Sequence, residues 1–472
     1  MTLLPQHESS ASSTWGIGPV RKSALALYAL MFVGAVGLFF LIDAAGAKLE
    51  ALPEPAHEAV GKVSVVPSAD PIGHVLIALT AVLVTGRVLA ALFRYVGQPP
   101  VIGEVVAGIL LGPSLLGQLW PEAAAFVLPA SVAPNLGLIA QLGVVLYMFL
   151  VGLELDTRLL TARAHATVAI SHASILVPFV LGSAMALFLY PRYSSSDVPF
   201  TCFALFMGVA MSITAFPVLA RILTDRQMHK TRLGVIALGC AAIDDVTAWC
   251  LLAFVVGVAQ ANLGGAVAVL GLTVAYMAFM FIIVRPLAAR FLTRLPASRL
   301  TPNVLASVLA GLLVSALITE SIGIHAVFGA FLLGAVIPHD CAVARAFTTR
   351  LEDLVTILLL PAYFAYTGMR TQVGLVSGID HWLVCGLIIV VATAGKFGGI
   401  LVSARLTGLR WRDATALGLL MNTRGLMELI ALNIGLDLKV ISPTLFAMMV
   451  LMALVTTMAA SPLLQLLPTG DE

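Results

Sequence analysis

MSITAFP at residues 211–217 interrupts one long apolar run of the sequence, and MNTRG at residues 421–425 interrupts a second. Pro217 removes a backbone hydrogen bond within a helix and clashes with the preceding turn. The second segment brings an asparagine, an arginine and a glycine into the middle of its apolar run. Backbone groups freed at membrane depth must line a cavity or be buried in protein. Both runs are therefore predicted to be broken helices around an internal site.

The composition of the chain is that of a membrane protein. Of its 472 residues, 60% are hydrophobic and 11% are charged, against about 25% charged residues in soluble domains. The net charge is +2 and the basic residues lie in short connections, so a nucleic-acid partner is not expected. The five cysteines have no C-x-x-C spacing and are interpreted as small buried hydrophobes, without a metal site.

Apolar runs long enough to span a bilayer recur along almost the whole chain. They predict an all-α integral membrane protein. Fourteen helices are expected, near 23–42, 72–95, 101–117, 135–153, 165–190, 200–223, 233–258, 265–284, 302–319, 322–338, 354–370, 381–404, 412–434 and 443–466.

The two broken helices occupy matching places in two six-helix groups, 72–258 and 302–466, where each is the fifth member. The single linker helix 265–284 between the groups makes them face opposite ways. Inverted repeats with paired broken helices indicate a secondary transporter whose site lies near the bilayer midplane. Each break alone could be an ordinary kink, but their matching positions favour transport.

The distribution of Lys and Arg predicts that both termini are cytoplasmic. One side of the membrane collects 18 of these residues, the other collects 5, and three lie within helices. The predicted order is a cytoplasmic tail (1–22), a retained N-terminal helix (23–42), an external polar loop (43–71), the main membrane domain (72–466) and a short cytoplasmic tail (467–472). The chain has no G-x-x-x-x-G-K-[ST] phosphate loop, so transport is expected to be driven by ion gradients.

Two adjacent aspartates, Asp244 and Asp245, stand in the otherwise apolar run 233–258. Neighbouring carboxylates in a membrane repel each other and lose hydration, which favours proton uptake by one of them. Their oxygens also suit alkali cations, so a proton and a cation would compete for one group, which is an exchange mechanism. The alternative is that the pair only neutralises a neighbouring Lys or Arg. Successive residues lie about 100° apart on a helix, so the two need not share a role.

Buried cations are the expected partners of these carboxylates. Lys396 lies midway along the run 381–404, too deep to reach the membrane surface comfortably, and is expected to pair with Asp244 or Asp245. Arg424 and Glu428 are four residues apart and are expected to pair on one helix face, with a structural role favoured over a role in transport.

Three further polar residues are weaker candidates. Asn422 in the second broken helix and Glu104 near the start of its helix are structural or gating candidates. His325 is interpreted as a hydrogen-bonded core histidine, with a proton relay left open.

Several motifs in order resemble those of monovalent cation:proton antiporters, the branch of bacterial Na⁺/H⁺ and K⁺/H⁺ antiporters and plant cation/H⁺ exchangers. They are GEVVAGILLGPS (103–114), FLVGLELD (149–156), SITAFPVLAR (212–221), the Asp244-Asp245 pair, GAVIP (334–338) and NTRGLMEL (422–429). The resemblance covers roughly residues 72–466. It implies an inverted-repeat fold of thirteen helices with two crossed discontinuous helices, which is usually a homodimer whose core bundle moves against the other bundle like an elevator.

The resemblance also implies roles for individual residues. Asp245 matches the main cation- and proton-binding aspartate and Asp244 the acidic position before it. Lys396 matches the basic residue that pairs with an aspartate. Thr214 and its neighbours in the first broken helix, Ser212 among them, would help Asp245 to ligate the cation.

Compared with the family that it resembles, the chain is expected to have an additional N-terminal helix and to lack the cytoplasmic nucleotide-binding regulatory domain found on many potassium-efflux relatives. We therefore expect a multi-pass protein of a cell membrane, such as a bacterial inner membrane, that exchanges Na⁺ or K⁺ for H⁺ without a cofactor. A Na⁺-coupled solute symporter is the alternative within transport. An enzyme is not expected, because the sequence contains neither a G-x-S-x-G nor an H-E-x-x-H motif.

Overall fold

A computed structural model of the chain describes residues 22–51, 71–154, 164–228, 231–260, 263–294 and 301–467. All regular elements in these ranges are helices, and eleven of the described helices are long and apolar enough to cross a membrane. Nearly all of the two predicted tails, most of the predicted loop 43–71 and Asp156 of the second motif lie outside the described residues.

The first predicted repeat folds as six membrane elements, of which the fifth is broken. Its helices are α2 (Pro71–Tyr95), α3 (Pro100–Leu111), α6 (Ala133–Glu154), α7 (Ala164–Tyr193), the pair α8 (Phe200–Ser212) and α9 (Phe216–Asp225), and α10 (Arg232–Gln260). Short helices α4 (Leu116–Leu119) and α5 (Pro121–Val127) connect α3 to α6. Pro217 lies in the first turn of α9, where its missing N–H needs no helical partner. The proline therefore begins a new half-helix.

The second repeat has the same order of elements. It consists of α13 (Pro302–Ile322), α14 (Ala326–Val336), α15 (Ala342–Leu354) with α16 (Leu360–Arg370), α17 (Gly378–Leu406), the broken pair α18 (Trp411–Met421) and α19 (Leu426–Asp437), and α20 (Pro443–Gln465). Between the repeats lie α11 (Leu263–Phe279) and α12 (Arg285–Leu292), joined by a π-helical turn at Met280–Val284.

Several helix ends differ from the predicted ones for local physical reasons. Gly323, with φ of +96°, ends α13, and α14 begins only after His325, so the predicted helix 322–338 is shorter. The predicted helix 354–370 begins earlier, because α15 runs through a π-helical turn at Val355–Leu359 into α16. Helix α15 is rich in charged residues, so a prediction based on apolar runs does not detect it.

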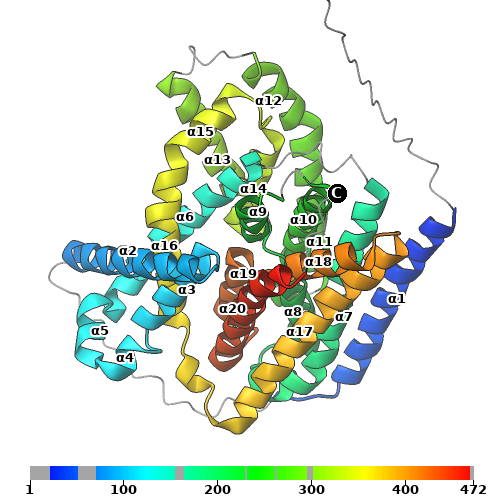
Figure 1. The fold of residues 1–472 in the computed structure, drawn as a ribbon, viewed down its shortest axis with the longest axis horizontal. Coiled ribbons are helices and arrows are strands. Elements are labelled where there is room, and N and C mark those ends of the chain that lie inside the picture. The colour runs from blue at the N-terminus through cyan, green and yellow to red at the C-terminus, as the bar shows by residue number, and fades with distance from the viewer. Residues whose placement is uncertain are drawn as a thin grey trace, which may run out of the picture.

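The two repeats interlock into two bundles. The first three elements of each repeat pack together, with α3 on α16 and α6 on α14. The last three elements do the same, with α7 on α17 and α10 on α18. We call these the flanking bundle (α2, α3, α6 and α13–α16) and the crossing bundle (α7–α10 and α17–α20), and Figure 1 shows them on the left and the right of the molecule.

Glycines allow the closest contacts inside the flanking bundle. A Cβ on Gly368 of α16 would lie 2.1 Å from the backbone of Gly108 on α3, and one on Gly334 of α14 would lie 2.3 Å from the backbone of α6. Helices in a bilayer associate through such close packing, because lipid provides little hydrophobic driving force between them. The flanking bundle is thus held by paired small residues.

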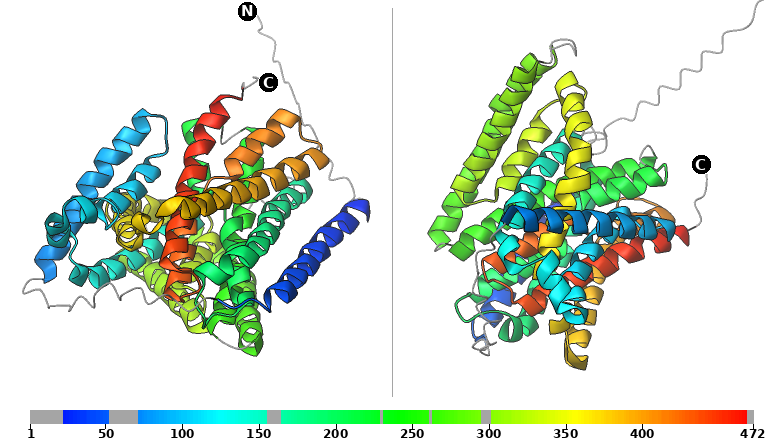
Figure 2. Two further views of the ribbon diagram at one scale, coloured as in Figure 1. Left: turned by 90° about the horizontal axis from the view of Figure 1, so that it is seen from below. Right: turned by 90° about the vertical axis from the view of Figure 1, so that its left-hand side faces the viewer.

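The N-terminal helix α1 (Lys22–Gly46) packs on α7 and α8 of the crossing bundle. The hydroxyl of Thr201 donates a hydrogen bond of 2.6 Å to Asp43 Oδ1, and the rings of Phe39 and Phe179 lie 5.7 Å apart. Helix α1 and the next helix, α2, lie at opposite edges of the molecule (Figures 1 and 2). The predicted helix 23–42 thus extends to Gly46.

Candidate functional site

The two broken helices meet in the crossing bundle. Helix α8 ends at Ser212 and α9 begins at Phe216, while α18 ends at Met421 and α19 begins at Leu426. The backbone N–H of Ala215 in the first unwound stretch donates a hydrogen bond of 3.0 Å to the carbonyl oxygen of Thr423 in the second. The broken helices therefore cross at their unwound stretches.

Two buried cations hold the last carbonyl groups of α8. Arg424 donates from Nη1 to Ala210 O at 2.9 Å and from Nη2 to Met211 O at 2.7 Å, and Lys396 Nζ donates to Ser212 O at 2.5 Å. Carbonyl groups at a helix C-terminus lack intrahelical partners and carry partial negative charge. The two cations therefore stabilise a helix end that has no access to bulk water.

Arg424 also forms an ion pair with Glu428. Their Nη1 and Oε2 atoms are 2.9 Å apart, and the two side chains are 1% and 0% exposed. The backbone N–H and carbonyl oxygen of Arg424 both hydrogen-bond to Thr457 Oγ1 at 2.8 Å. The second break is therefore fixed by its own arginine.

Asp244 on α10 is surrounded by hydrogen-bond donors. Ser171 donates to Oδ1 at 2.6 Å, and Ser174 and Thr214 donate to Oδ2 at 2.5 and 2.9 Å. Lys396 Nζ lies 3.1 Å from the same oxygen, with both side chains at 1% exposure or less, and donates a further bond of 3.0 Å to Ser174 O. The carboxylate and the ammonium group thus neutralise each other in a closed network.

Asp245 is equally buried, with 1% of its surface exposed, but its environment is the opposite. Neither of its carboxylate oxygens has a hydrogen-bond partner among the described residues. A buried carboxylate that is ionised and unpaired carries a large desolvation penalty. Binding of a proton or a cation would remove that penalty, so Asp245 is the carboxylate of this site with both oxygens available to a ligand.

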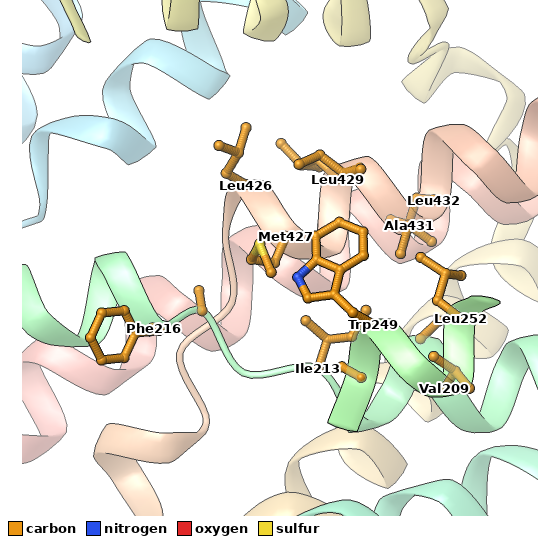
Figure 3. Close-up of a cluster of buried hydrophobic side chains, with 14 of the residues drawn as sticks. Val209, Ile213, Phe216, Trp249, Leu252, Leu426, Met427, Leu429, Ala431 and Leu432 are labelled. Carbon is orange, nitrogen blue, oxygen red and sulfur yellow. The ribbon is translucent and has the colours of Figure 1, made fainter. Parts of the chain in front are cut away.

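A cluster of mostly apolar side chains begins one helical turn along α10 from Asp245. Trp249, one helical turn beyond Asp245 on α10, gathers with Ile213 of the first break and Met427 and Leu429 of α19 in one cluster, in which each is at most 4% exposed (Figure 3). Such surroundings have a low effective dielectric, which strengthens the interaction of Asp245 with any charge beside it.

A cavity lies next to the crossing, between the two bundles. It is lined by Val105 of α3, by Gly425 and Leu429 at the start of α19, and by Thr457 of α20, among other residues. This is a place where the unwound backbone of the second break borders space between the bundles.

The structure places the other predicted residues in different roles. The hydroxyl of Ser212 has its one proton within reach of Ile175 O and Gly208 O, at 2.9 and 2.7 Å, so only its carbonyl group takes part in the network around Lys396. Asn422 is 6% exposed, and its Oδ1 has no hydrogen-bond partner among the described residues. The Cγ atom of Glu104 lies 3.9 Å from where a Cβ on Gly86 of α2 would stand, so this side chain faces α2.

His325 caps the N-terminus of α14. Its Nδ1 accepts a hydrogen bond of 3.4 Å from the backbone N–H of Val327. This contact gives the histidine a structural task at a helix end.

Ser171 and Ser174 are site residues that the sequence analysis missed. Both are completely buried on α7. Their spacing of three residues places them on one helix face, and two hydroxyls on one face of a long apolar run were the available signal. The sequence did not show that this face meets Asp244.

Comparisons with known proteins agree with this architecture. The family model described as "Sodium/hydrogen exchanger, transmembrane" matches residues 77–467. The Na⁺/H⁺ antiporter NhaS4 of Synechocystis is 44% identical over 392 residues, covering 82% of this chain and 96% of that protein. The K⁺/H⁺ antiporter 1 of Saccharomyces cerevisiae is 34% identical, covering 84% of this chain and 47% of that protein, so the chain spans about half of that longer relative.

A solved structure has the same fold. It is the sodium proton antiporter MjNhaP1 of Methanocaldococcus jannaschii, with a TM-score of 0.62, 14% identity, and coverage of 84% of this chain and 97% of that one. The match confirms the predicted all-α antiporter fold, while the number of membrane spans stays a prediction. The Na⁺-coupled symporter, left open by the sequence, finds no support in these matches.

Proposed function

Because this chain belongs to the sodium/hydrogen exchanger family, we propose that Asp245 is the group on which it exchanges a monovalent cation for protons. The observation that carries this assignment is the contrast between the two adjacent carboxylates. Asp244 accepts hydrogen bonds from three hydroxyls and Lys396, whereas Asp245 has no hydrogen-bond partner among the described residues. A carboxylate without a partner has both oxygens available to bind either a proton or a cation.

The exchange follows from charge balance at Asp245. The ionised carboxylate in an apolar site requires a positive charge beside it, and the proton and the cation are alternatives because they use the same oxygens. The Asp244–Lys396 pair is neutral as a unit and keeps its own partners. The charge of Asp245 is therefore neutralised when either a proton or a cation is bound, and the site can move across the membrane in both of these states. The empty site keeps an unpaired charge and cannot move.

Oxygen atoms of the first break would complete the coordination of the cation. Thr214 Oγ1 donates its proton to Asp244, and a hydroxyl that donates still has lone pairs to offer a cation. Carbonyl oxygens of the unwound stretch 213–215 would add ligands of the same hard type. The Ser212 carbonyl is less suitable, because it already accepts from Lys396.

Access to both sides would come from movement of the crossing bundle relative to the flanking bundle. The residues of the network around Asp244 all belong to the crossing bundle, so the site would move as a unit.

We also propose a homodimer with both chain termini in the cytoplasm of a cell such as a bacterium. K⁺ and Na⁺ are the candidate cations. Native mass measurement and one-sided labelling of added cysteines test these two assignments.

The direct experiment is proton flux in sealed proteoliposomes with Na⁺, K⁺, Li⁺ or Rb⁺ added one at a time. We expect the wild-type chain to respond to at least one cation and Asp245→Asn to respond to none, because an amide cannot alternate between a proton and a cation. Asp413→Asn, which removes a carboxylate from an exposed pair with Arg410 on α18, is the matched control and should retain exchange. Near wild-type flux in Asp245→Asn would overturn the assignment.

A further inference from the structure

A polar network joins α16 of the flanking bundle to α19 of the crossing bundle. Asn433 on α19 donates from Nδ2 to Tyr363 OH at 3.2 Å and to Thr367 Oγ1 at 3.0 Å. Arg370 Nη1 donates to Asn433 Oδ1 at 3.1 Å, and Arg370 also pairs with Asp437. We call these five residues the latch.

The latch lies at the surface end of α19, away from the crossing. Helix α19 runs from the unwound stretch at Gly425 to Asp437, and α16 ends at Arg370 beside it. In the topology predicted from the count of Lys and Arg, this end lies outside the cell. The loop after α19 is tied to the end of α7 on the same side, where Ser442 N–H donates to Tyr193 O at 3.0 Å.

The buried part of the latch carries most of its strength. Asn433, Tyr363 and Thr367 are 6%, 5% and 1% exposed. By contrast, the Arg370 and Asp437 side chains are 22% and 56% exposed, and ion pairs this accessible to water contribute little. Leaving a buried amide without partners is costly, so the central contact is the amide of Asn433.

The side chains of the latch connect helices that otherwise pack on different neighbours. Helix α16 packs on α2, α3 and α6, whereas α19 packs on α8 and α20. Asn433 Nδ2 also lies 2.9 Å from Leu429 O of its own helix, so its two N–H groups serve three acceptors, this carbonyl and the two hydroxyls of α16. A contact made of hydroxyls and one amide can be released reversibly, because water replaces the lost hydrogen bonds once the helices separate.

We propose that the latch is the outer gate of the exchanger, with Asn433 as its central residue. It holds the crossing bundle against α16 in the state that is closed to the outside, and it opens when Asp245 becomes accessible from that side. This inference rests on the proposed function, since an exchanger must expose its site to both sides in turn.

The first test locks the gate. Thr367→Cys combined with Asn433→Cys is bridged in proteoliposomes by a short bifunctional thiol reagent that a reductant reverses. We expect exchange to fall at least tenfold when the pair is bridged and to return on reduction. Asp43→Cys with Thr201→Cys is the matched control. The same reagent would link α1 to α8 at another pair of hydrogen-bonded side chains, and this link should leave exchange unchanged.

The second test measures opening without transport. Leu429 lies one helical turn inside Asn433 and is 2% exposed, so Leu429→Cys reports access by a membrane-impermeant thiol reagent from outside. Adding Asn433→Leu, which keeps the number and branching of the side-chain heavy atoms and removes the amide, should raise the labelling rate about tenfold. Arg410→Gln, which breaks an exposed pair at the start of α18, should leave the rate unchanged.

The outcomes separate the gate from the function. Full exchange with the 367–433 pair bridged, failure of the pair to bridge, or unchanged labelling in the Asn433→Leu background would each overturn the gate. Absence of exchange in the wild-type chain with every cation, together with a normal labelling response, would instead overturn the proposed function and leave the gate standing.

Discussion

Removal of the Lys396 ammonium group should destabilise the protein through the carboxylate that it leaves behind. Lys396→Met keeps an unbranched side chain one atom shorter and removes three contacts, to Asp244 Oδ2 at 3.1 Å, Ser174 O at 3.0 Å and Ser212 O at 2.5 Å. The three hydroxyl donors to Asp244 remain, so the carboxylate keeps hydrogen bonds but loses its counter-charge.

The size of the effect follows from this geometry. Breaking a buried ion pair from one side costs about 3–5 kcal/mol, whereas replacing both partners by neutral groups is often close to neutral. Lys396→Met should therefore lower the free energy of unfolding by about 3–5 kcal/mol. Adding Asp244→Asn should restore most of that loss, because the amide needs no counter-charge and keeps an oxygen for Ser171. The expected coupling energy between the two positions is about 2 kcal/mol or more.

Denaturant unfolding of the purified protein in detergent, followed by tryptophan fluorescence, measures these values as a double-mutant cycle. Arg410→Gln is the control, because its pair with Asp413 is exposed and should contribute less than about 1 kcal/mol. If Lys396→Met costs no more than Arg410→Gln, or if the double variant loses the sum of the two single losses, the reasoning about a closed neutral pair is refuted.

Three further variants test the packing of the flanking bundle and the hydrogen bonds around the crossing. Gly368→Ala would place a Cβ 2.1 Å from the backbone of α3 and should lower the free energy of unfolding by about 1–3 kcal/mol or more. Its control, Gly386→Ala, would place a Cβ with nothing within 4 Å and should be tolerated. Thermal unfolding compares the two variants. Arg424→Lys should cost about 1–3 kcal/mol, because a single ammonium group cannot reproduce the fork that holds two carbonyls of α8, and an unchanged unfolding midpoint would contradict that role. Ser171→Ala should cost about 1.5–3 kcal/mol through the lost bond to Asp244, with Ser171→Thr expected to recover part of it in the same assay.

The sequence predicted those parts of the fold that depend on local chemistry. Apolar runs of membrane length gave the helices, and Pro217 and Gly425 marked the breaks, because proline and glycine act on the backbone where they stand. The prediction failed for the first part of α15, where charges hide a helix that continues into α16. A search for apolar runs of membrane length detects only helices that are apolar throughout.

The sequence did not predict which aspartate pairs with Lys396. Asp244 and Asp245 are adjacent, and their roles are set by what each helix face meets across the bundle. The face of Asp244 meets Ser171 and Ser174 of α7 together with Lys396 of α17, a contact between segments about 70 and 150 residues apart in the chain. Spacing along one helix carries no information about such partners.

The most direct test of the central claim is the apparent affinity for the transported cation, measured across pH 5–9 at a clamped membrane potential. If a proton and a cation share Asp245 one for one, the apparent dissociation constant should rise about tenfold for each unit of falling pH on the acidic side. It should level off at higher pH, where no proton competes. A dissociation constant that is independent of pH throughout this range would contradict the shared carboxylate.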